Sequence, residues 1–202
     1  MARRQEQGSK ALGEIILAAG EEIVAEAGLK GLSAREIARR IGYSPGTIYN
    51  VFDNLDEVVL RIEAGVLDRL DAELGATAPA GRPRDDLVRL GRAYLAFTHA
   101  NARLWSMLFE HTLPDGAEIP DWYRMRLDRL LARVETAIAP LFAHGDQARI
   151  GEAARVLWAG VHGIASLSVA DKLTIITRVP ARDMIDNLIT NYVAGLATSQ
   201  DV

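Results

Sequence analysis

The run 44–52 (SPGTIYNVF) combines residue types that contact nucleic acids and contains no charged residue. Thr47 and Tyr49 supply hydroxyl donors for phosphate oxygens, and Asn50 offers an amide for two hydrogen bonds with a base edge. Gly46 lets a backbone approach a phosphate closely because it has no side chain. These residues form a candidate surface for backbone and base contacts on DNA.

Helix-start and helix-stop signals place this run on the second helix of a helix-turn-helix. Ser33 suits an N-cap, with Glu36 completing a capping box, and Gly42 supplies a left-handed stop for the first helix. Ser44 then caps a new helix whose first position is Pro45. Free N–H groups at both helix starts, near Ser33 and Ser44, suit phosphate oxygens. We therefore expect two short helices joined by a tight turn.

Apolar spacing predicts which side of the second helix is buried. Ile48 and Phe52 lie one turn apart and are expected to face the core. The polar residues of the run then point outward, with Thr47 on the flank. Tyr43 is expected to pack against Ile48 as a hydrophobic staple.

Helical periodicity continues along the chain, and no run shows sustained period-two alternation, so the predicted fold class is all-α. Asn54 and Glu57 form a further capping box. The stretch 75–84 (GATAPAGRPR) is the best domain boundary. We divide the chain into a helix-turn-helix domain (1–55), a connecting helix and linker (56–84) and a helical C-terminal domain (85–202). The expected helices are 10–27, 34–41, 45–52, 54–74, 85–99, 102–112, 120–144, 146–173 and 181–197.

Composition limits the classes of protein that fit. The chain of 202 residues has no cysteine, which excludes thiolate catalysis and disulfides. The net charge of −4 by itself argues against a nucleic-acid binder, and residues 1–60 carry 7 Lys and Arg against 9 Asp and Glu. Any DNA affinity must come from backbone donors and locally placed cations, such as Arg3, Arg4 and Lys10 in the basic N-terminal tail. No signal peptide or membrane-spanning run is evident, so a cytoplasmic location is expected.

No motif supports catalysis or a cofactor. The histidines lie on separate segments without paired metal-ligand spacing, at His99, His111, His144 and His162. Phosphate-binding loops, nucleophile elbows and dinucleotide fingerprints are absent from the sequence. We expect no enzyme activity, no metal and no cofactor.

The run 31–49 (GLSAREIARRIGYSPGTIY) resembles the DNA-binding domain of the TetR family. That resemblance implies a dimer that binds double-stranded operator DNA. The residues it implies for DNA contact, together with the basic tail, are Ser33, Arg35, Ser44, Pro45, Gly46, Thr47, Tyr49, Asn50, Arg3 and Arg4. Two positions depart from the family pattern. Val51 and Leu55 stand where such regulators often have a histidine and a lysine that reach phosphates, and two fewer cationic contacts weaken binding.

The runs 103–109 (RLWSMLF) and 158–167 (WAGVHGIASL) resemble the TetR subgroup named for the Trp, His and Gly of its C-terminal domain. Such a domain generally holds a small-molecule effector and dimerises through its last two helices. Candidate ligand-binding residues are Tyr94, Trp105, Met107, Phe109, Tyr123, Trp158 and His162. The interpretation favoured for His162 alone is plainer: a buried histidine bonded to a backbone carbonyl, with Trp158 filling the core.

The helix near 154–168 is apolar on more than one face, which favours packing inside the subunit on one side and against a symmetry mate on the other. The expected function is a ligand-responsive repressor that binds a palindromic operator as a homodimer and is released by a small molecule. The alternative is a ligand-binding or protein-interaction module of the same fold with weak or lost DNA binding. Val51, Leu55 and the net negative first 60 residues motivate that alternative.

Overall fold

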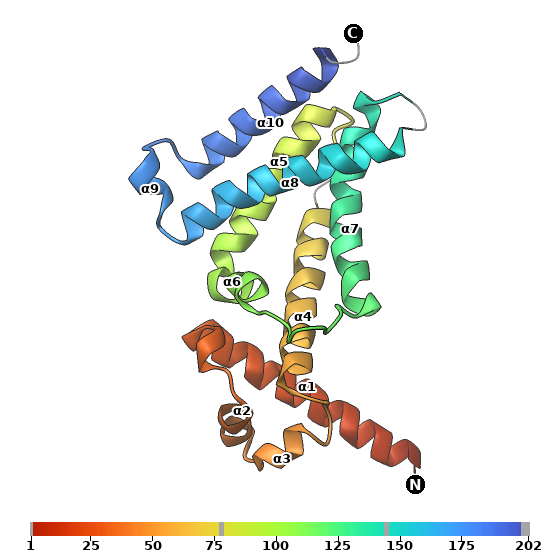
Figure 1. Cartoon of the computed structure of the whole chain (residues 1–202), viewed down its shortest axis with the longest axis vertical. Helices are drawn as coiled ribbons and strands as arrows, with labels where there is room; N and C mark the ends of the chain where they lie inside the picture. The colour runs from red at the N-terminus through yellow and green to blue at the C-terminus, as the bar shows by residue number, and fades with distance from the viewer. Residues whose placement is uncertain (1, 77–78, 144–145, 199–202) are drawn as a thin grey trace. The chain divides into compact units, whose positions relative to one another are not determined.

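The computed structural model describes the backbone of residues 2–76, 79–143 and 146–198, and within these ranges the side chains from residue 8 to residue 196. The described residues form helices and no strand, so the predicted all-α fold class is confirmed (Figure 1). The chain divides into two compact units, residues 1–67 with 101–123 and residues 68–100 with 124–202. Helices α4 (Leu55–Gly75) and α7 (Asp121–Ile138) each contribute to both units.

The first unit is built on α1 (Ala2–Ala27), which packs against α2 (Ala34–Ile41) and α6 (Ala102–Glu110). The short helix η1 (Leu29–Gly31) precedes α2, and α2 packs against α3 (Pro45–Ile48). Its core is aliphatic, with fully buried side chains at Ile16, Ile23, Ile37, Ile48, Ile62 and Met107. Gly20 allows α1 to approach α4 closely, because a Cβ at this position would lie 2.7 Å from Cδ1 of Ile62.

The second unit is centred on α5 (Pro83–Ala100), α8 (Gln147–Val169) and α10 (Ala181–Thr198), which contact one another pairwise (Figure 1). Two glycines make these contacts close. A Cβ at Gly91 of α5 would lie 2.8 Å from Cγ2 of Ile185, and one at Gly160 of α8 would lie 2.8 Å from Cδ2 of Leu188. The short helices η2 (Ala139–Leu141) and α9 (Leu173–Ile176) complete this unit.

Several helix ends differ from the sequence-based expectations. Helix α3 ends at Ile48 instead of residue 52, because the N–H groups of Asn50 and Val51 bond three residues back and tighten the chain into turns. Helix α7 ends at Ile138 and not at 144, just before Pro140, which lacks the N–H that the helix would need. Helix α8 ends at Val169 and not at 173. Two residues later Asp171 takes a left-handed conformation with φ of 55°, which a continuing helix would not allow.

None of the helices that the structure describes combines the length and apolar character needed to cross a lipid bilayer.

Candidate functional site

The first helix of the helix-turn-helix, α2, begins and ends at the predicted residues. Oγ of Ser33 accepts a hydrogen bond from the backbone N–H of Glu36 at 3.2 Å, which confirms the N-cap. Gly42 has φ of 76°, and the next N–H, of Tyr43, donates to the carbonyl of Ala38 at 2.9 Å. The capping box is incomplete, however. The Glu36 carboxylate accepts two hydrogen bonds from Arg39, at 2.8 and 2.6 Å, because a guanidinium is the stronger donor.

Ser44 starts α3 with extended backbone, and Pro45 follows at the first helical position. The predicted cap forms only in part, because the Ser44 hydroxyl lies 3.1 Å from the hydroxyl of Thr47 and not on a backbone N–H. The Thr47 N–H donates to the carbonyl of Ser44 at 3.0 Å. Two hydroxyls thus lie together at the start of α3.

The two faces of α3 and its following turn have the predicted polarity. Ile48 and Phe52 are buried, whereas Gly46, Tyr49 and Asn50 are exposed. Thr47, also as predicted, lies between the two faces and is half-buried. The aliphatic anchors hold the helix in place and leave its hydrogen-bonding side chains in solvent. We call the exposed surface of Gly46, Thr47, Tyr49 and Asn50 the α3 face.

Tyr43 is the residue predicted to pack against Ile48 as a staple. It remains 53% exposed directly after the left-handed Gly42. Exposure costs a tyrosine less than an aliphatic residue, because its hydroxyl stays hydrated.

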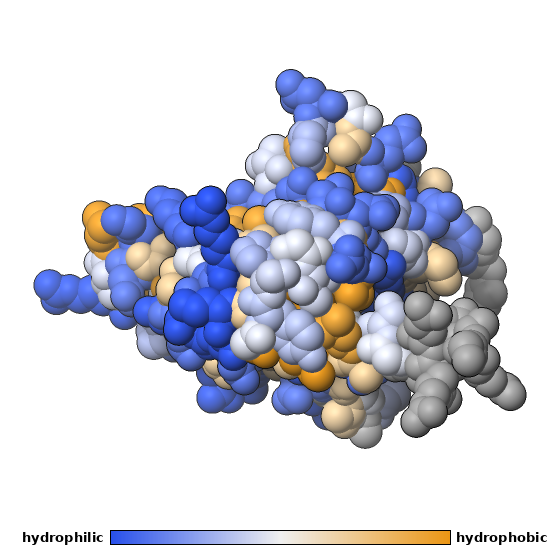
Figure 2. Space-filling model, turned by 90° about the horizontal axis from the view of Figure 1, so that it is seen from below, coloured by the Kyte–Doolittle hydropathy of each residue, from blue (hydrophilic) through white to orange (hydrophobic). Residues whose placement is uncertain are grey.

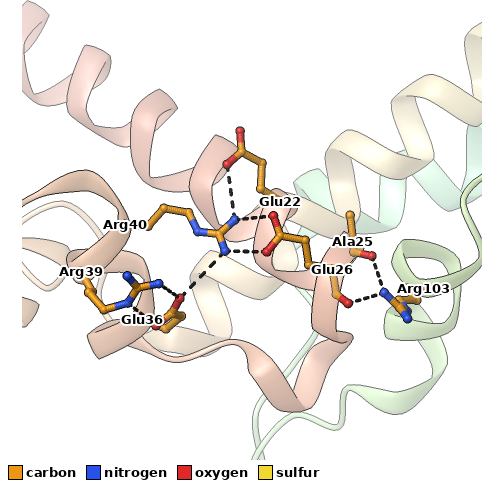
Figure 3. A network of polar contacts seen from close by, with 7 residues as sticks. All are labelled: Glu22, Ala25, Glu26, Glu36, Arg39, Arg40 and Arg103. Atoms are coloured by element: carbon orange, nitrogen blue, oxygen red, sulfur yellow. Dashed lines mark hydrogen bonds and ion pairs between the residues drawn. The ribbon is translucent and has the colours of Figure 1, made fainter.

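The arginines of α2 differ in their availability to a ligand (Figure 3). Arg40 is held by Glu26 at 2.7 Å and Glu22 at 3.5 Å, and its hydrogen bonds lower the pKa of Glu26. Arg39 is paired with Glu36, as described above. Arg35 is exposed and has no ion pair with any described residue, so its guanidinium is free for an anion.

The face seen in Figure 2 is mainly hydrophilic, with separate apolar areas.

The basic N-terminal tail is only partly described. Its backbone begins α1, but the side chains of Arg3 and Arg4 lie outside the described residues. Lys10, the next cation along α1, is exposed.

The start of α4 carries the predicted capping box. Oδ1 of Asn54 accepts from the N–H of Glu57 at 2.8 Å, and the Glu57 carboxylate accepts from the N–H of Asp53 at 2.9 Å. Val51 and Leu55 on either side are half-buried. Apolar side chains therefore occupy the two positions where the family pattern has cations, and carboxylates are close to them in the sequence.

In the second unit, three of the predicted ligand-binding residues come together. The Tyr94 hydroxyl lies 2.7 Å from Nδ1 of His162, and the Trp158 ring stacks on the imidazole with centroids 5.2 Å apart. The other ring nitrogen lies 3.1 Å from Oγ of Ser166. Two hydroxyls thus satisfy the ring, so the expected carbonyl partner is wrong, and Trp158 is 37% exposed and not core filler. Burial lowers the pKa of His162, which favours the neutral ring.

The other predicted ligand-binding residues lie in the first unit. Trp105, Met107 and Tyr123 are buried there, and Phe109 is 51% exposed with its ring 5.6 Å from that of Trp105. Burial raises the pKa of Tyr123, so its hydroxyl remains protonated. The set chosen from sequence is therefore divided between two compact units.

A cavity of about 390 Å³ lies in the second unit, where α4 ends and α5 begins. Its walls are mainly apolar, with two arginines and one carboxylate, and the lining residues are Leu74, Gly75, Pro79, Gly81, Pro83, Asp86, Arg89, Leu90, Arg133, Thr136, Ala137 and Pro140. None of them is among the ligand-binding residues predicted from sequence. The Pro-rich linker 75–84 contributes to this lining, but its composition indicates only a domain boundary. No cluster of metal-ligating side chains occurs among the residues searched, which are those that the structure describes.

A helix-turn-helix with an exposed hydrogen-bonding face, followed by a larger helical region, defines the class of a helical DNA-binding regulator. Residues 16–62 match the family described as "Bacterial regulatory proteins, tetR family". Residues 87–192 match "Tetracyclin repressor-like, C-terminal domain". The chain belongs to the TetR family of transcriptional regulators.

Individual relatives agree with this assignment. An HTH-type transcriptional regulator of Mycobacterium tuberculosis is 26% identical over 195 residues, covering 79% of this chain and 83% of the relative. A Rhodococcus protein of unknown function has the same fold, with a TM-score of 0.74 and 22% identity over 92% of this chain and 95% of that chain. Thermus thermophilus FadR, a TetR family repressor in complex with lauroyl-CoA, has a TM-score of 0.65 and 19% identity over 91% of this chain and 94% of that chain.

Proposed function

We propose that this chain is a ligand-responsive repressor that binds a palindromic operator as a homodimer in the cytoplasm and leaves it when a small molecule binds. The observation that supports this proposal most directly is the α3 face. Buried Ile48 and Phe52 anchor it, and Tyr49 and Asn50 are exposed beside it. In this role residues 1–55 bind DNA, 56–84 connect, and 85–202 bind the effector and dimerise.

The roles of the DNA-binding residues follow from their chemistry. Asn50 reads a base edge, and Tyr49 and Thr47 donate to phosphates. Gly46 and Pro45 let the start of α3 approach the DNA backbone, where Ser44 also lies. Ser33 and Arg35 hold a phosphate at the start of α2, with help from Arg3 and Arg4.

The dimer is proposed to form through α8 and α10. Val156, Ala159, Gly163 and Leu167 lie on one stripe of α8, and Val156 and Leu167 are 53% and 38% exposed. A Cβ at Gly163 would meet no described atom within 4 Å. Small and apolar residues on an exposed stripe suit a second helix at close range. A dimer of this kind presents two α3 faces to successive major grooves, roughly 34–36 Å apart.

The effector is proposed to bind in the helical C-terminal region, and the Thermus repressor of the same fold is in complex with a small molecule, lauroyl-CoA. The proposal includes membership of the Trp-His-Gly subgroup, which the resemblance at Trp158, His162 and Gly163 supports. His162 with Tyr94 and Trp158 forms the proposed site within the second unit, and Trp105, Met107, Phe109 and Tyr123 are separate ligand-binding candidates within the first unit. Release requires that the effector bind more tightly to the conformer whose α3 faces do not fit the grooves.

Binding to the DNA upstream of the chain's own gene tests the proposal. We expect a saturable complex whose affinity falls as salt rises, because phosphate contacts release counterions. Addition of the effector should lower the affinity of the protein for this DNA. An effector that binds tightly and leaves the operator affinity unchanged would contradict the release mechanism.

A second candidate function is a ligand-binding or protein-interaction module that has lost DNA binding. It is favoured by the half-buried Val51 and Leu55 and by the pairing of Arg39 and Arg40 with glutamates. Absence of any salt-sensitive complex with the upstream DNA would favour this function over the repressor.

A further inference from the structure

A group of titratable side chains in the first unit joins the end of α6 to the start of α4. His111, the residue after α6, has a side chain that is only 9% exposed. Its Nε2 lies 3.1 Å from Oδ1 of Asp56, and its Nδ1 lies 3.2 Å from Oε1 of Glu63. Glu63 itself is only 2% exposed. Asp56 and Glu63 are two turns apart on α4, so they lie on one helix face and hold the ring between them.

The partners of the ring determine its protonation. Each ring nitrogen of His111 lies close to a carboxylate oxygen, and an ionised carboxylate only accepts hydrogen bonds, so a ring with a hydrogen on each nitrogen suits both contacts. Such a ring is an imidazolium with one positive charge between two negative ones. The contact with the Glu63 carboxylate, followed by the hydrogen bond to Asp56, raises the pKa of His111 and outweighs its burial.

Other elements packed against this group add no competing cation to it. From α7, the Tyr123 hydroxyl remains protonated, because burial and the charge of Glu63 raise its pKa. Arg61 of α4 is engaged elsewhere, because it pairs with Glu57 at 3.2 Å and lies 4.2 Å from the centre of the Trp122 ring. Asp56 and Glu63 are therefore the charged groups that face His111 within the described chain.

The location of this group connects it to the α3 face. Asp56 lies in the first turn of α4, within the capping box of Asn54 and Glu57 that ends the turn after α3. A neutral ring has one hydrogen, so one of its nitrogens would present a lone pair to a carboxylate. The ring would then lose its bond to Asp56 or leave the buried Glu63 without its partner, which is costly.

We propose that His111 is a positioning residue for DNA binding, whose imidazolium clamps the end of α6 to the first three turns of α4 and so holds the α3 face in its binding position. Loss of the proton opens the clamp, and operator affinity falls as pH rises. This inference rests on the proposed function for its DNA readout, but the clamp itself is measured without DNA.

The sign of the pH effect follows from the direction of the shift. A histidine whose pKa is raised by folding stabilises the protein fully below its unfolded pKa, about 6.5. That contribution is lost as pH rises through the folded pKa. The clamp therefore weakens on the alkaline side, above the ordinary titration of histidine.

The test uses the full chain and four proteins: wild type, His111→Gln, Asp56→Asn and the control His99→Gln, whose ring contacts Ser168 in the second unit. NMR of the imidazole nitrogens follows the titration of His111. Anisotropy with double-stranded DNA from upstream of the gene follows affinity between pH 6 and 9. We expect the DNA affinity of the wild type and of His99→Gln to fall about tenfold between the acidic and the alkaline end of this range. A loss of this size corresponds to about one hydrogen bond to a charged group. His111→Gln should be flat with pH, and Asp56→Asn should move the midpoint to lower pH.

A His111 ring that titrates at or below its ordinary pKa would overturn the clamp, whatever the DNA result. So would a His111→Gln protein with the wild-type pH profile. If no variant binds DNA but the ring titrates high and Asp56→Asn lowers its pKa, the clamp stands and the proposed DNA binding fails. Asp56→Asn also covers the case in which His111→Gln does not fold, because it keeps the ring and Glu63.

Discussion

At the scale of single residues, the α3 face contains two kinds of hydrogen-bonding group. Tyr49 has one hydroxyl at the end of a ring that is 52% exposed, which suits a phosphate but carries little sequence information. Asn50, next in the chain, has a donor and an acceptor in one plane, which fits a base edge. The two residues should therefore differ in what their loss does to specificity.

Tyr49→Phe is expected to weaken binding to all DNA sequences alike, because it removes a phosphate donor and keeps the ring. Asn50→Ala should cost about 1–3 kcal/mol on the preferred operator and relax the preference at one base position. Anisotropy with a set of operators mutated one position at a time measures both effects. Equal losses across every operator for both variants would remove the base-reading role of Asn50.

The lack of a cationic phosphate contact at the start of α4 can also be tested by changing one residue. Leu55→Lys places a cation where the family pattern has one. The position is half-buried, so the aliphatic part of the lysine side chain can remain packed while its ammonium group reaches solvent. We expect tighter binding and a steeper dependence of log K on log salt, by about 0.9. Gln147→Lys, on an exposed residue of α8, adds the same charge far along the chain and is the control. An unchanged slope for Leu55→Lys would mean that this position does not reach a phosphate.

The sequence predicted the local chemistry of this site better than its long-range pairs. The cap of Ser33, the left-handed Gly42 and the burial of Ile48 follow from neighbours within one or two turns. Glu63 and His111 are distant in sequence, and no period or motif indicates that the fold brings them together. Local rules were also insufficient where a stronger donor competed. The Glu36 carboxylate accepts hydrogen bonds from Arg39 and not from the backbone N–H that completes a capping box.

At the scale of elements, the second unit depends on how closely α5 and α8 approach α10. Gly91 and Gly160 mark these approaches, since a Cβ at either would fall within 2.9 Å of a side chain of α10. An ion pair between Arg92 and Asp186 joins α5 to α10 beside them. Apolar periodicity identified these helices, but the close approach depends on which glycines face a neighbour. Glycine counts and spacing do not show this.

Gly91→Ala is expected to destabilise the chain by about 1–3 kcal/mol, because the methyl group would overlap Ile185 and Ile189. Gly195→Ala is the matched control on α10, where a Cβ meets nothing within 4 Å and alanine favours the helix by about 1 kcal/mol. Urea unfolding followed by circular dichroism measures the difference. A Gly91→Ala protein as stable as the Gly195→Ala protein would show that α5 and α10 can separate without cost.

At the scale of the whole molecule, the proposed function requires two copies. A single helix-turn-helix offers one short reading element, whereas a palindrome is read by two elements at a fixed spacing. The exposed stripe of α8 is the surface from which we infer the pairing. Its small residues would place the two copies close together.

Gly163→Arg introduces a large charged side chain into the middle of this stripe, where nothing described lies within 4 Å of a Cβ. We expect the subunit to keep its helicity, the mass in solution to fall from two chains to one, and operator affinity to fall with it. Gln147→Arg, at the exposed start of the same helix, should leave the dimer intact. Analytical ultracentrifugation gives the mass, and a dimeric Gly163→Arg protein would place the interface elsewhere.

Titration of the upstream DNA fragment by anisotropy, repeated over several salt concentrations and against a random duplex of equal length, tests whether the chain is a sequence-specific repressor. For a dimeric repressor we expect saturation at two chains per site, a steep loss of affinity with salt, and specific binding at least about 10³-fold tighter than binding to the random duplex. Equal affinity for both duplexes, or no salt-sensitive binding to either, would contradict the repressor proposal.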